Sequence, residues 1–427
     1  MTTNRPAGSA SDAFGFADAP STDPLILGWM TGSPPPPDKL IRYEDGSFLR
    51  FPMWRWSFSH WRELVPTVNV ARGAGAPSPL PRTERDDLDA VGFTPLGATR
   101  PMTWAESVDA NYTDGIVVLQ RGRIVYERYF GALTAERPHI AFSVTKSFFG
   151  IIAATLIVER RLDADARIAH YLPELAVSGF GDATVRQVLD MTTALRHTEL
   201  YGDPAADFFD YARATGLAPR RPGYAGARTT YEYLATVAQA GEHGPAFGYR
   251  SINTDVAGWL IARVTGQSLQ DVLSERLWGA LGVEDDAHLQ VDSIGTPLVA
   301  VALNARLRDL ARFGEMLRLD GRFNGRQIVP AEVVADLRRG GNREAFARAE
   351  YQTLPGWSYH NQWWISHNDH GAYMARGIHG QAIYVDPTAE MVIARFASHP
   401  LASNVNLDPT SLPAYHALAR HLITHPG

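Results

Sequence analysis

A nearly unbroken apolar run over residues 148–158 places the strongest constraint on how this chain folds. At 3.6 residues per turn the run makes about three helical turns. A helix that is apolar on all its sides is buried on most of them. The segment AFSVTKS, residues 141–147, comes directly before the run and carries Ser143 and Lys146. We therefore predict a buried helix that begins at Ser143, with the lysine in its first turn.

Lysine is rare in this chain. Lys39 and Lys146 are the two lysines among 40 Lys and Arg residues, so a retained lysine suggests a role that a guanidinium group does not fill. A desolvated lysine can lose its proton and accept one from a neighbour, whereas arginine stays protonated. Ser-x-x-Lys on a helix places the hydroxyl and the amine one turn apart on one face. The pattern favours Ser143 as a nucleophile activated by Lys146; a chance pattern on a structural helix is the alternative.

Composition excludes several classes of function. The net charge is −6 and no basic tract is interleaved with aromatic residues, which argues against nucleic acid as a partner. The chain has no cysteine, so disulfides, thiolate metal sites and cysteine nucleophiles are excluded. The first twenty residues lack the basic and apolar regions of a secretory signal, and no apolar run reaches membrane-spanning length. We expect a cytoplasmic protein with no membrane partner.

Strands are predicted at both ends of the chain around a helical middle. Residues 116–120 and 123–130 read as a hairpin, 381–387 and 390–396 as two strands joined by an Asp-Pro turn, and 416–423 as a closing helix. This order predicts an α/β (α+β) fold in which an antiparallel sheet flanked by helices is assembled from both termini. The expected domains are a partly flexible N-terminal arm at 1–50, a sheet domain from 51–160 and 291–427, and a mainly helical domain at 161–290.

Three tryptophans, Trp54, Trp56 and Trp61, lie within eight residues. Such a cluster packs an arm onto the body of a protein more often than it forms a ligand platform, and we favour the packing role.

Several segments appear in an order that resembles the serine β-lactamase/penicillin-binding protein superfamily. The resemblance is greatest to the 6-aminohexanoate-dimer (nylon-oligomer) hydrolases and related carboxylesterases, and it runs from about Trp54 to Leu422. The segments that carry it are Ser143-Val144-Thr145-Lys146, Gln187-Val188-Leu189-Asp190-Met191, Tyr249-Arg250-Ser251-Ile252-Asn253, Gln362-Trp363-Trp364 and Gly377-Ile378-His379-Gly380-Gln381. The resemblance implies a β-lactamase/penicillin-binding-protein-like fold with its active site in the cleft between the sheet domain and the helical domain.

The resemblance also implies roles for individual residues. Ser143 is expected to attack a carbonyl and form an acyl-enzyme, with Lys146 as base or electrostatic activator and Tyr249 as the proton shuttle to the leaving group. A lysine ammonium beside Tyr249 is expected to lower the pKa of the phenol. The backbone N–H groups of Ser143 and Ile378 are the expected oxyanion donors. For Tyr249 the alternative is a core tyrosine.

The expected substrate contacts are Tyr201, Ser251, Asn253, Trp364 and His379, although a satisfied structural role for His379 is the more common alternative. Tyr201 matches a loop tyrosine that the nylon-oligomer hydrolases close over an amide. Ala212 and Ala300 stand where that family has polar and acidic contacts to the substrate amine. A pocket without that charge favours esters or neutral amides, and the expected partner is a small-molecule ester or amide substrate.

Other functions are less favoured. No Lys-Thr-Gly motif occurs, and the corresponding Ala375-Arg376-Gly377 leaves Arg376 alone to meet a β-lactam carboxylate. Gly-x-Ser-x-Gly and His-Glu-x-x-His are both absent, so neither an α/β-hydrolase elbow nor a metal is expected, and we expect no cofactor. A D-amino-acid peptidase or amidase, or a weak β-lactamase, is the alternative activity. A non-catalytic scaffold is a third possibility, and a homodimer is conceivable.

Overall fold

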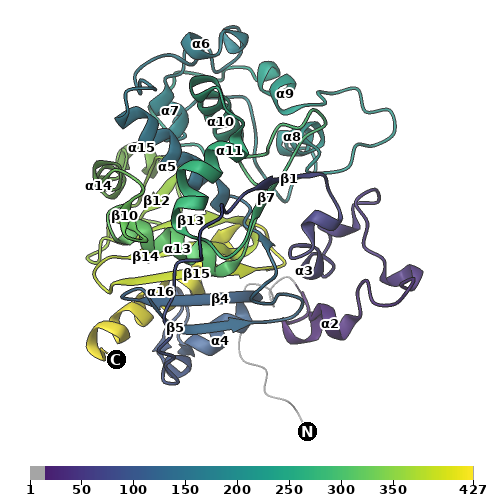
Figure 1. Ribbon diagram of the computed structural model, residues 1–427. Helices are drawn as coiled ribbons and strands as arrows, with labels where there is room; N and C mark the ends of the chain where they lie inside the picture. The colour runs from purple at the N-terminus through teal and green to yellow at the C-terminus, as the bar shows by residue number, and fades with distance from the viewer. Residues whose placement is uncertain (1–14, 427) are drawn as a thin grey trace.

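The computed structural model describes residues 15–426, and Figure 1 shows a helical region lying above a sheet. The first 14 residues of the arm that was predicted to be partly flexible lie outside the described residues. The sheet has seven strands in the order β11-β12-β13-β14-β15-β4-β5, and every neighbouring pair is antiparallel. Its strands are β4 (Thr113–Gln120), β5 (Arg123–Tyr129), β11 (Ser358–His360), β12 (Trp363–Ile365), β13 (Tyr373–Gly377), β14 (Gln381–Asp386) and β15 (Met391–Ala397).

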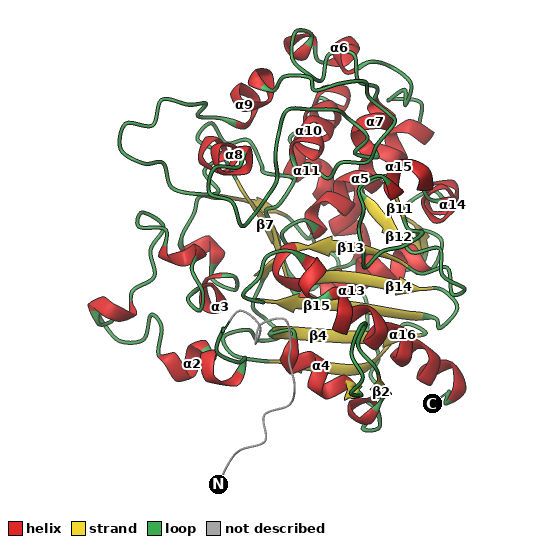
Figure 2. Ribbon diagram, turned by 180° about the vertical axis from the view of Figure 1, so that it is seen from behind, coloured by secondary structure: helices red, strands yellow, loops and turns green. Residues whose placement is uncertain are grey.

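The central strands are apolar on both faces, because helices cover each face. Val117 and Leu119 of β4 belong to one apolar cluster with α13 (Leu307–Arg318), whereas Ile116 and Val118 belong to another with α4 (Trp104–Ala110) and α16 (Asp408–Thr424). This alternation follows from the two-residue period of a strand. Figure 2 shows the sheet from behind, between these helices. Both predicted hairpins are present, and the closing helix begins earlier than predicted, at Asp408.

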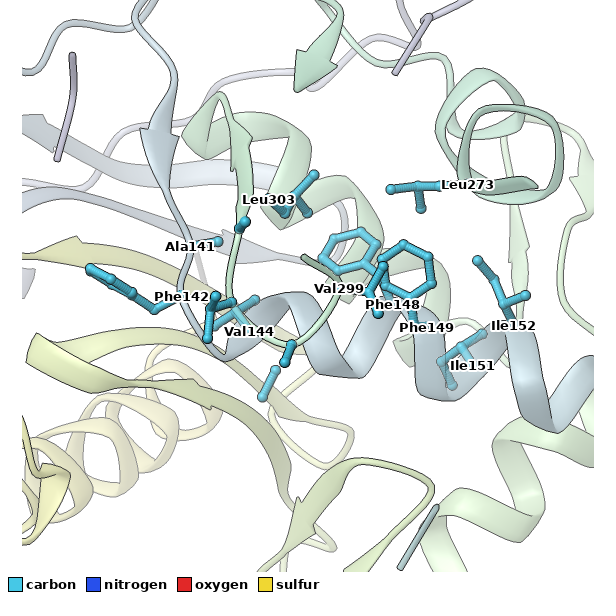
Figure 3. Close-up of a cluster of buried hydrophobic side chains, with 14 of the residues drawn as sticks. Ala141, Phe142, Val144, Phe148, Phe149, Ile151, Ile152, Leu273, Val299 and Leu303 are labelled. Carbon is cyan, nitrogen blue, oxygen red and sulfur yellow. The ribbon is translucent and has the colours of Figure 1, made fainter. Parts of the chain in front are cut away.

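The predicted buried helix is α5 (Val144–Val158), and Figure 3 shows it among apolar side chains that include Leu273, Val299 and Leu303. Thirteen of its residues, Val144 to Leu156, are buried. Gly150 lets the chain pass closely, because a Cβ at this position would lie 2.1 Å from the carbonyl oxygen of Asn361. The helix therefore forms the centre of the molecule and presents its N-terminal end to the region between the sheet and the helical part.

The remaining helices lie mainly in the middle of the chain. They are α2 (Pro24–Leu27), α3 (Trp54–Ser57), α6 (Ile168–Tyr171), α7 (Val185–Leu189), α8 (Asp207–Thr215), α9 (Thr230–Thr236), α10 (Ile252–Thr265), α11 (Leu269–Leu273), α12 (Gly279–Leu281), α14 (Ala331–Arg339) and α15 (Arg343–Ala347). The smaller strands are β1 (Thr67–Val70), β2 (Gly92–Phe93), β3 (Met102–Thr103), β6 (His139–Ile140), β7 (Ala287–Gln290), β8 (Leu303–Ala305), β9 (Arg322–Phe323) and β10 (Arg326–Gln327).

A second sheet, ordered β1-β7-β8-β6, joins the N-terminal part of the chain to its centre. β7 lies inside the segment 161–290 that was predicted as mainly helical, and it pairs with β1. The predicted domain boundary near residue 290 therefore falls at the end of a strand, because this small sheet draws on both sides of that boundary. The predicted fold class, an antiparallel sheet flanked by helices with a largely helical segment between its halves, is confirmed.

The tryptophan cluster attaches the arm to the body. The indole N–H of Trp61 donates to Gln290 Oε1 over 2.9 Å, and that of Trp54 donates to the Ser398 carbonyl over 3.1 Å. Trp56 and Trp61 are buried. These contacts agree with the packing role. Trp54 also has a second role, which the next subsection describes.

Candidate active site

Ser143 lies where the chain turns into α5. Phe142, the residue before it, has φ 43°, in the left-handed region that a bulky side chain rarely occupies. This conformation costs on the order of 1–3 kcal/mol, and strain of this kind concentrates at functional sites. Strand β13 passes close by, because a Cβ on Gly377 would lie 2.7 Å from the Ala141 carbonyl oxygen. Ser143 is therefore held between a strained turn and the end of β13.

Lys146 points back along α5 toward Ser143. Its Nζ lies 2.9 Å from Ser143 Oγ, 3.0 Å from Ser251 Oγ and 2.7 Å from the Ala300 carbonyl oxygen. The side chain is buried, and this burial lowers the pKa of Lys146, while the charges of Glu199 and Asp255 oppose the shift. Three acceptors match the three N–H bonds of an ammonium group. Lys146 must therefore lose a proton before it can take one from Ser143.

Tyr249 lies in the loop before α10, above the Lys146 amine. Lys146 Nζ is 5.2 Å from the centroid of its ring, and the Ser143 side chain acts to lower the pKa of Tyr249. Burial, reinforced by the charge of Glu199, raises the pKa of Tyr249 well above its usual range. The expectation that the lysine lowers this pKa is therefore wrong, because desolvation of the phenolate outweighs the other effects. The phenol stays protonated and suits the role of an acid.

Glu199 is a member of the site that the sequence did not reveal. Its carboxylate accepts hydrogen bonds from the Ser251 hydroxyl over 2.6 Å, the Ser251 N–H over 2.5 Å and the Tyr201 hydroxyl over 2.6 Å. The Glu199 side chain is only 2% exposed. Acidic residues are common in surface loops, so an acidic residue in a loop does not by itself indicate a functional site. The one feature of the sequence that could have pointed to Glu199 is its position two residues before Tyr201.

The two expected oxyanion donors belong to backbone segments held by neighbouring groups. The Gly377 carbonyl accepts a hydrogen bond from Asn404 Nδ2 over 3.0 Å, and the Ile378 carbonyl accepts one from Gln381 Nε2 over 3.0 Å. Ser143 precedes the first turn of α5, where unpaired N–H groups and the helix dipole favour negative charge. This fixed geometry is suited to holding an oxyanion.

A cavity of about 860 Å³ opens beside these groups, and its lining includes Phe142, Tyr249 and Ile378. Most of its other lining residues are apolar or aromatic, and they include Leu49, Trp54, Phe208, Phe209, Ala212, Leu217 and Ala218. Trp54 therefore packs the arm and lines the cavity at the same time. The volume suits a small molecule, and the apolar wall suits an uncharged substrate group.

His379 also lines the cavity, and its hydrogen bonds determine its chemistry. Its Nδ1 lies 2.7 Å from the His399 carbonyl oxygen, which only accepts, so Nδ1 carries the proton. Burial lowers the pKa of His379 to about 4, which leaves the ring neutral at physiological pH. The structural role weighed from the sequence is present, and Nε2 remains available as an acceptor.

The structure brings only some of the predicted substrate contacts to the cavity. Tyr201 and His379 are in its wall, and Ser251 lies behind the wall on Lys146. Asn253 does not reach the wall, because its side chain is buried and bonded to Thr193 over 2.7 Å. Trp364 lies behind the ring of Tyr249, at 5.6 Å between ring centroids.

Two further positions differ from their expected roles. Ala212 lines the cavity, whereas Ala300 is fully buried and meets Lys146 through its carbonyl rather than facing the cavity. Arg376 is buried, pairs with Asp408 and lies 5.0 Å from the centroid of the Trp364 ring. Arg376 is therefore occupied within the protein and is not positioned to meet the carboxylate of a β-lactam.

Within residues 15–426, no group of three or more His, Cys, Asp or Glu side chains could hold a metal ion. Over the same part of the chain, no helix has the length and apolar character needed to cross a bilayer.

The fold, with a serine and a buried lysine at the start of its central helix, is that of a class of serine hydrolases. Residues 108–410 match the model of the β-lactamase family, and the chain belongs to that family. It is 34% identical over 355 residues to the 6-aminohexanoate-dimer hydrolase of Paenarthrobacter ureafaciens, a match that covers 83% of this chain and 88% of that protein.

Solved structures agree with this assignment. A Bacillus anthracis protein assigned as a 6-aminohexanoate-dimer hydrolase superposes with a TM-score of 0.82 and 31% identity, over 92% of this chain and all of the other. A family VIII carboxylesterase shares the fold, with a TM-score of 0.55 and 18% identity over 74% of this chain and 96% of the other. The prediction of a serine hydrolase of the β-lactamase family is thereby confirmed. The roles of individual residues remain predictions.

Proposed function

We propose that this enzyme hydrolyses small esters and neutral linear amides through an acyl-enzyme on Ser143. The observation that carries the proposal is the buried Lys146 amine, 2.9 Å from Ser143 Oγ beside a cavity of about 860 Å³. A neutral Lys146 takes the Ser143 proton as Oγ bonds to the substrate carbonyl carbon. The N–H groups of Ser143 and Ile378 stabilise the resulting oxyanion. Tyr249 then donates a proton to the leaving group, and water hydrolyses the acyl-enzyme by the reverse sequence.

The cavity supports a preference for uncharged substrates. Its wall near α8 is formed by Phe208, Phe209 and Ala212, and no acidic side chain lines it on that helix. The acidic residues of its lining are Asp203, in the loop before α8, and Glu199, whose carboxylate is already bonded by the hydroxyls of Tyr201 and Ser251. A cationic amine would be desolvated there without a partner, which costs several kcal/mol. Short-chain esters are therefore the expected best substrates, ahead of the aminohexanoate dimer that names the relatives.

The test combines active-site labelling with a substrate panel. A fluorophosphonate probe should label Ser143, and Ser143→Ala should abolish both labelling and turnover by several orders of magnitude. The panel compares p-nitrophenyl esters, aminohexanoate dimer, a D-amino-acid amide and nitrocefin. Undiminished labelling of Ser143→Ala would overturn the assignment of the nucleophile. Faster cleavage of the dimer than of any simple ester would overturn the assignment of the substrate.

A further inference from the structure

The Lys146 ammonium group is connected to a carboxylate by a single hydroxyl. Ser251 Oγ accepts a hydrogen bond from Lys146 Nζ over 3.0 Å and donates its own hydrogen to Glu199 Oε1 over 2.6 Å. Each group therefore already points its proton toward the next. The Glu199 side chain is only 2% exposed, and Glu199 also lines the cavity, so its carboxylate lies between Ser251 and the cavity.

We propose that Glu199 is a positioning residue that receives, through the Ser251 hydroxyl, the proton that Lys146 must lose before it can activate Ser143. The proposal rests on the proposed function of Ser143 and Lys146. In this step an N–H bond of Lys146 breaks and a new O–H bond forms on Ser251. The original Ser251 proton moves to Glu199 Oε1. An ammonium and a carboxylate become an amine and a carboxylic acid with no proton exchanged with solvent.

The other groups around Glu199 allow this transfer. The ionisable neighbours are Lys146 on α5, Arg250 in the loop before α10, and Asp255 on α10, whose pKa burial raises to about 7. Burial also lowers the pKa of the adjacent His197. The charge of Glu199 contributes to raising the pKa values of six tyrosines, namely Tyr201, Tyr211, Tyr233, Tyr249, Tyr351 and Tyr359. Because these pKa values are raised, the tyrosines stay protonated near pH 7. The pKa of Lys146 is instead lowered by burial, so Lys146 gives up a proton more readily than these tyrosines.

The transfer makes a distinctive prediction for pH dependence. Because the pair keeps the same number of protons, the wild-type acylation rate should be flat between about pH 6 and 8. Glu199→Gln removes the acceptor, so Lys146 must lose its proton to solvent. The rate should then fall about tenfold for each pH unit below the Lys146 pKa. A purely electrostatic role predicts the opposite, because the Glu199 charge raises the pKa of Lys146 and its removal would improve activity at low pH.

The experiment measures fluorophosphonate labelling of Ser143 and kcat and KM for p-nitrophenyl acetate from pH 5.5 to 9. Glu199→Gln and Ser251→Ala should each lose at least about tenfold in kcat at pH 6.5 and gain the sloping profile, with KM little changed. Glu199→Asp should restore part of the plateau. Glu174→Gln, which removes an exposed carboxylate paired with Arg263, should keep the wild-type profile.

A wild-type plateau retained in either folded variant, or a gain in activity at low pH, would overturn the proton transfer. Because Ser251→Ala interrupts the same path at a different residue, one folded variant is sufficient. Failure of the wild-type protein to label at Ser143 would instead overturn the proposed function. The two results are therefore distinguishable.

Discussion

At the scale of single residues, Lys146 is the group whose chemistry is most open to test. Lys146→Arg keeps the positive charge but removes the capacity to accept a proton. We expect Lys146→Arg to be nearly as inactive as Lys146→Ala, with each losing about 10²–10⁴-fold in kcat on p-nitrophenyl esters. An active Lys146→Arg enzyme would show that residue 146 supplies only a positive field. Thermal melts of both variants would check that the fold is intact.

Tyr201 should distinguish amide from ester cleavage. Its hydroxyl donates to Glu199 in the free enzyme, and its ring lines the cavity. An amide needs its leaving nitrogen protonated, whereas an alkoxide leaves more readily without help. Tyr201→Phe should therefore lower amide turnover more than ester turnover, and Tyr249→Phe should lower both. Equal losses for both substrates in Tyr201→Phe would contradict this role.

Ala212 is the position at which substrate charge can be tested. Ala212→Asp would place a carboxylate in the apolar wall and supply a partner for an ammonium group. We expect kcat/KM for the aminohexanoate dimer to rise, by about tenfold for each 1.4 kcal/mol gained. Ala212→Asn has nearly the same shape without the charge and serves as the matched control. An equal rise in both variants would assign the effect to shape.

At the scale of elements, the close contact of α5 with the loop at Asn361 is the feature most sensitive to size. Gly150→Ala would place a Cβ 2.1 Å from the Asn361 carbonyl oxygen, and the backbone must shift to admit it. Overpacking of this kind costs about 1–3 kcal/mol. Urea unfolding should show this loss for Gly150→Ala. Gly75→Ala, whose Cβ meets no atom within 4 Å, should change stability by less than about 0.5 kcal/mol.

The elements differ in how far the sequence could predict them. The hairpin of β4 and β5, the strands β14 and β15 and the helix α5 have local signals: alternation, turn residues and an apolar run. Phe142 carries no such signal, because its left-handed conformation is imposed by the strand and helix that it joins. Glu199 and Ser251 lie 52 residues apart in the sequence, and only the tertiary fold brings them together.

At the scale of the whole molecule, one histidine links three separate elements. His360 at the end of β11 lies 3.0 Å from Asp190 Oδ2 after α7 and 2.8 Å from Asp336 Oδ2 on α14. Burial alone would lower the pKa of His360, but the hydrogen bonds with the two carboxylates raise it to about 9. Because this pKa lies above that of the unfolded chain, its stabilising contribution is complete below about pH 6.5. The contribution is lost as the pH rises through about 9.

The free energy of unfolding should therefore fall by on the order of 2 kcal/mol between about pH 6.5 and 9. In His360→Asn this part of the decline should be absent, because the amide does not titrate in that range. Denaturant unfolding at several pH values measures the difference. A decline of the same size in His360→Asn would assign the pH dependence to other groups.

The rarity of lysine, together with the burial of Lys146, has a practical consequence for how the protein can be attached to other materials. Apart from the amino terminus of the chain, Lys39 is the single amine outside the active site, and it lies in the N-terminal arm, partly exposed, 5.1 Å from the centroid of the Trp29 ring. Reagents that couple to amines should therefore immobilise the enzyme through its arm in a nearly uniform orientation. The cavity wall formed by α8 would remain unmodified, and the Lys146 amine would be protected by its burial.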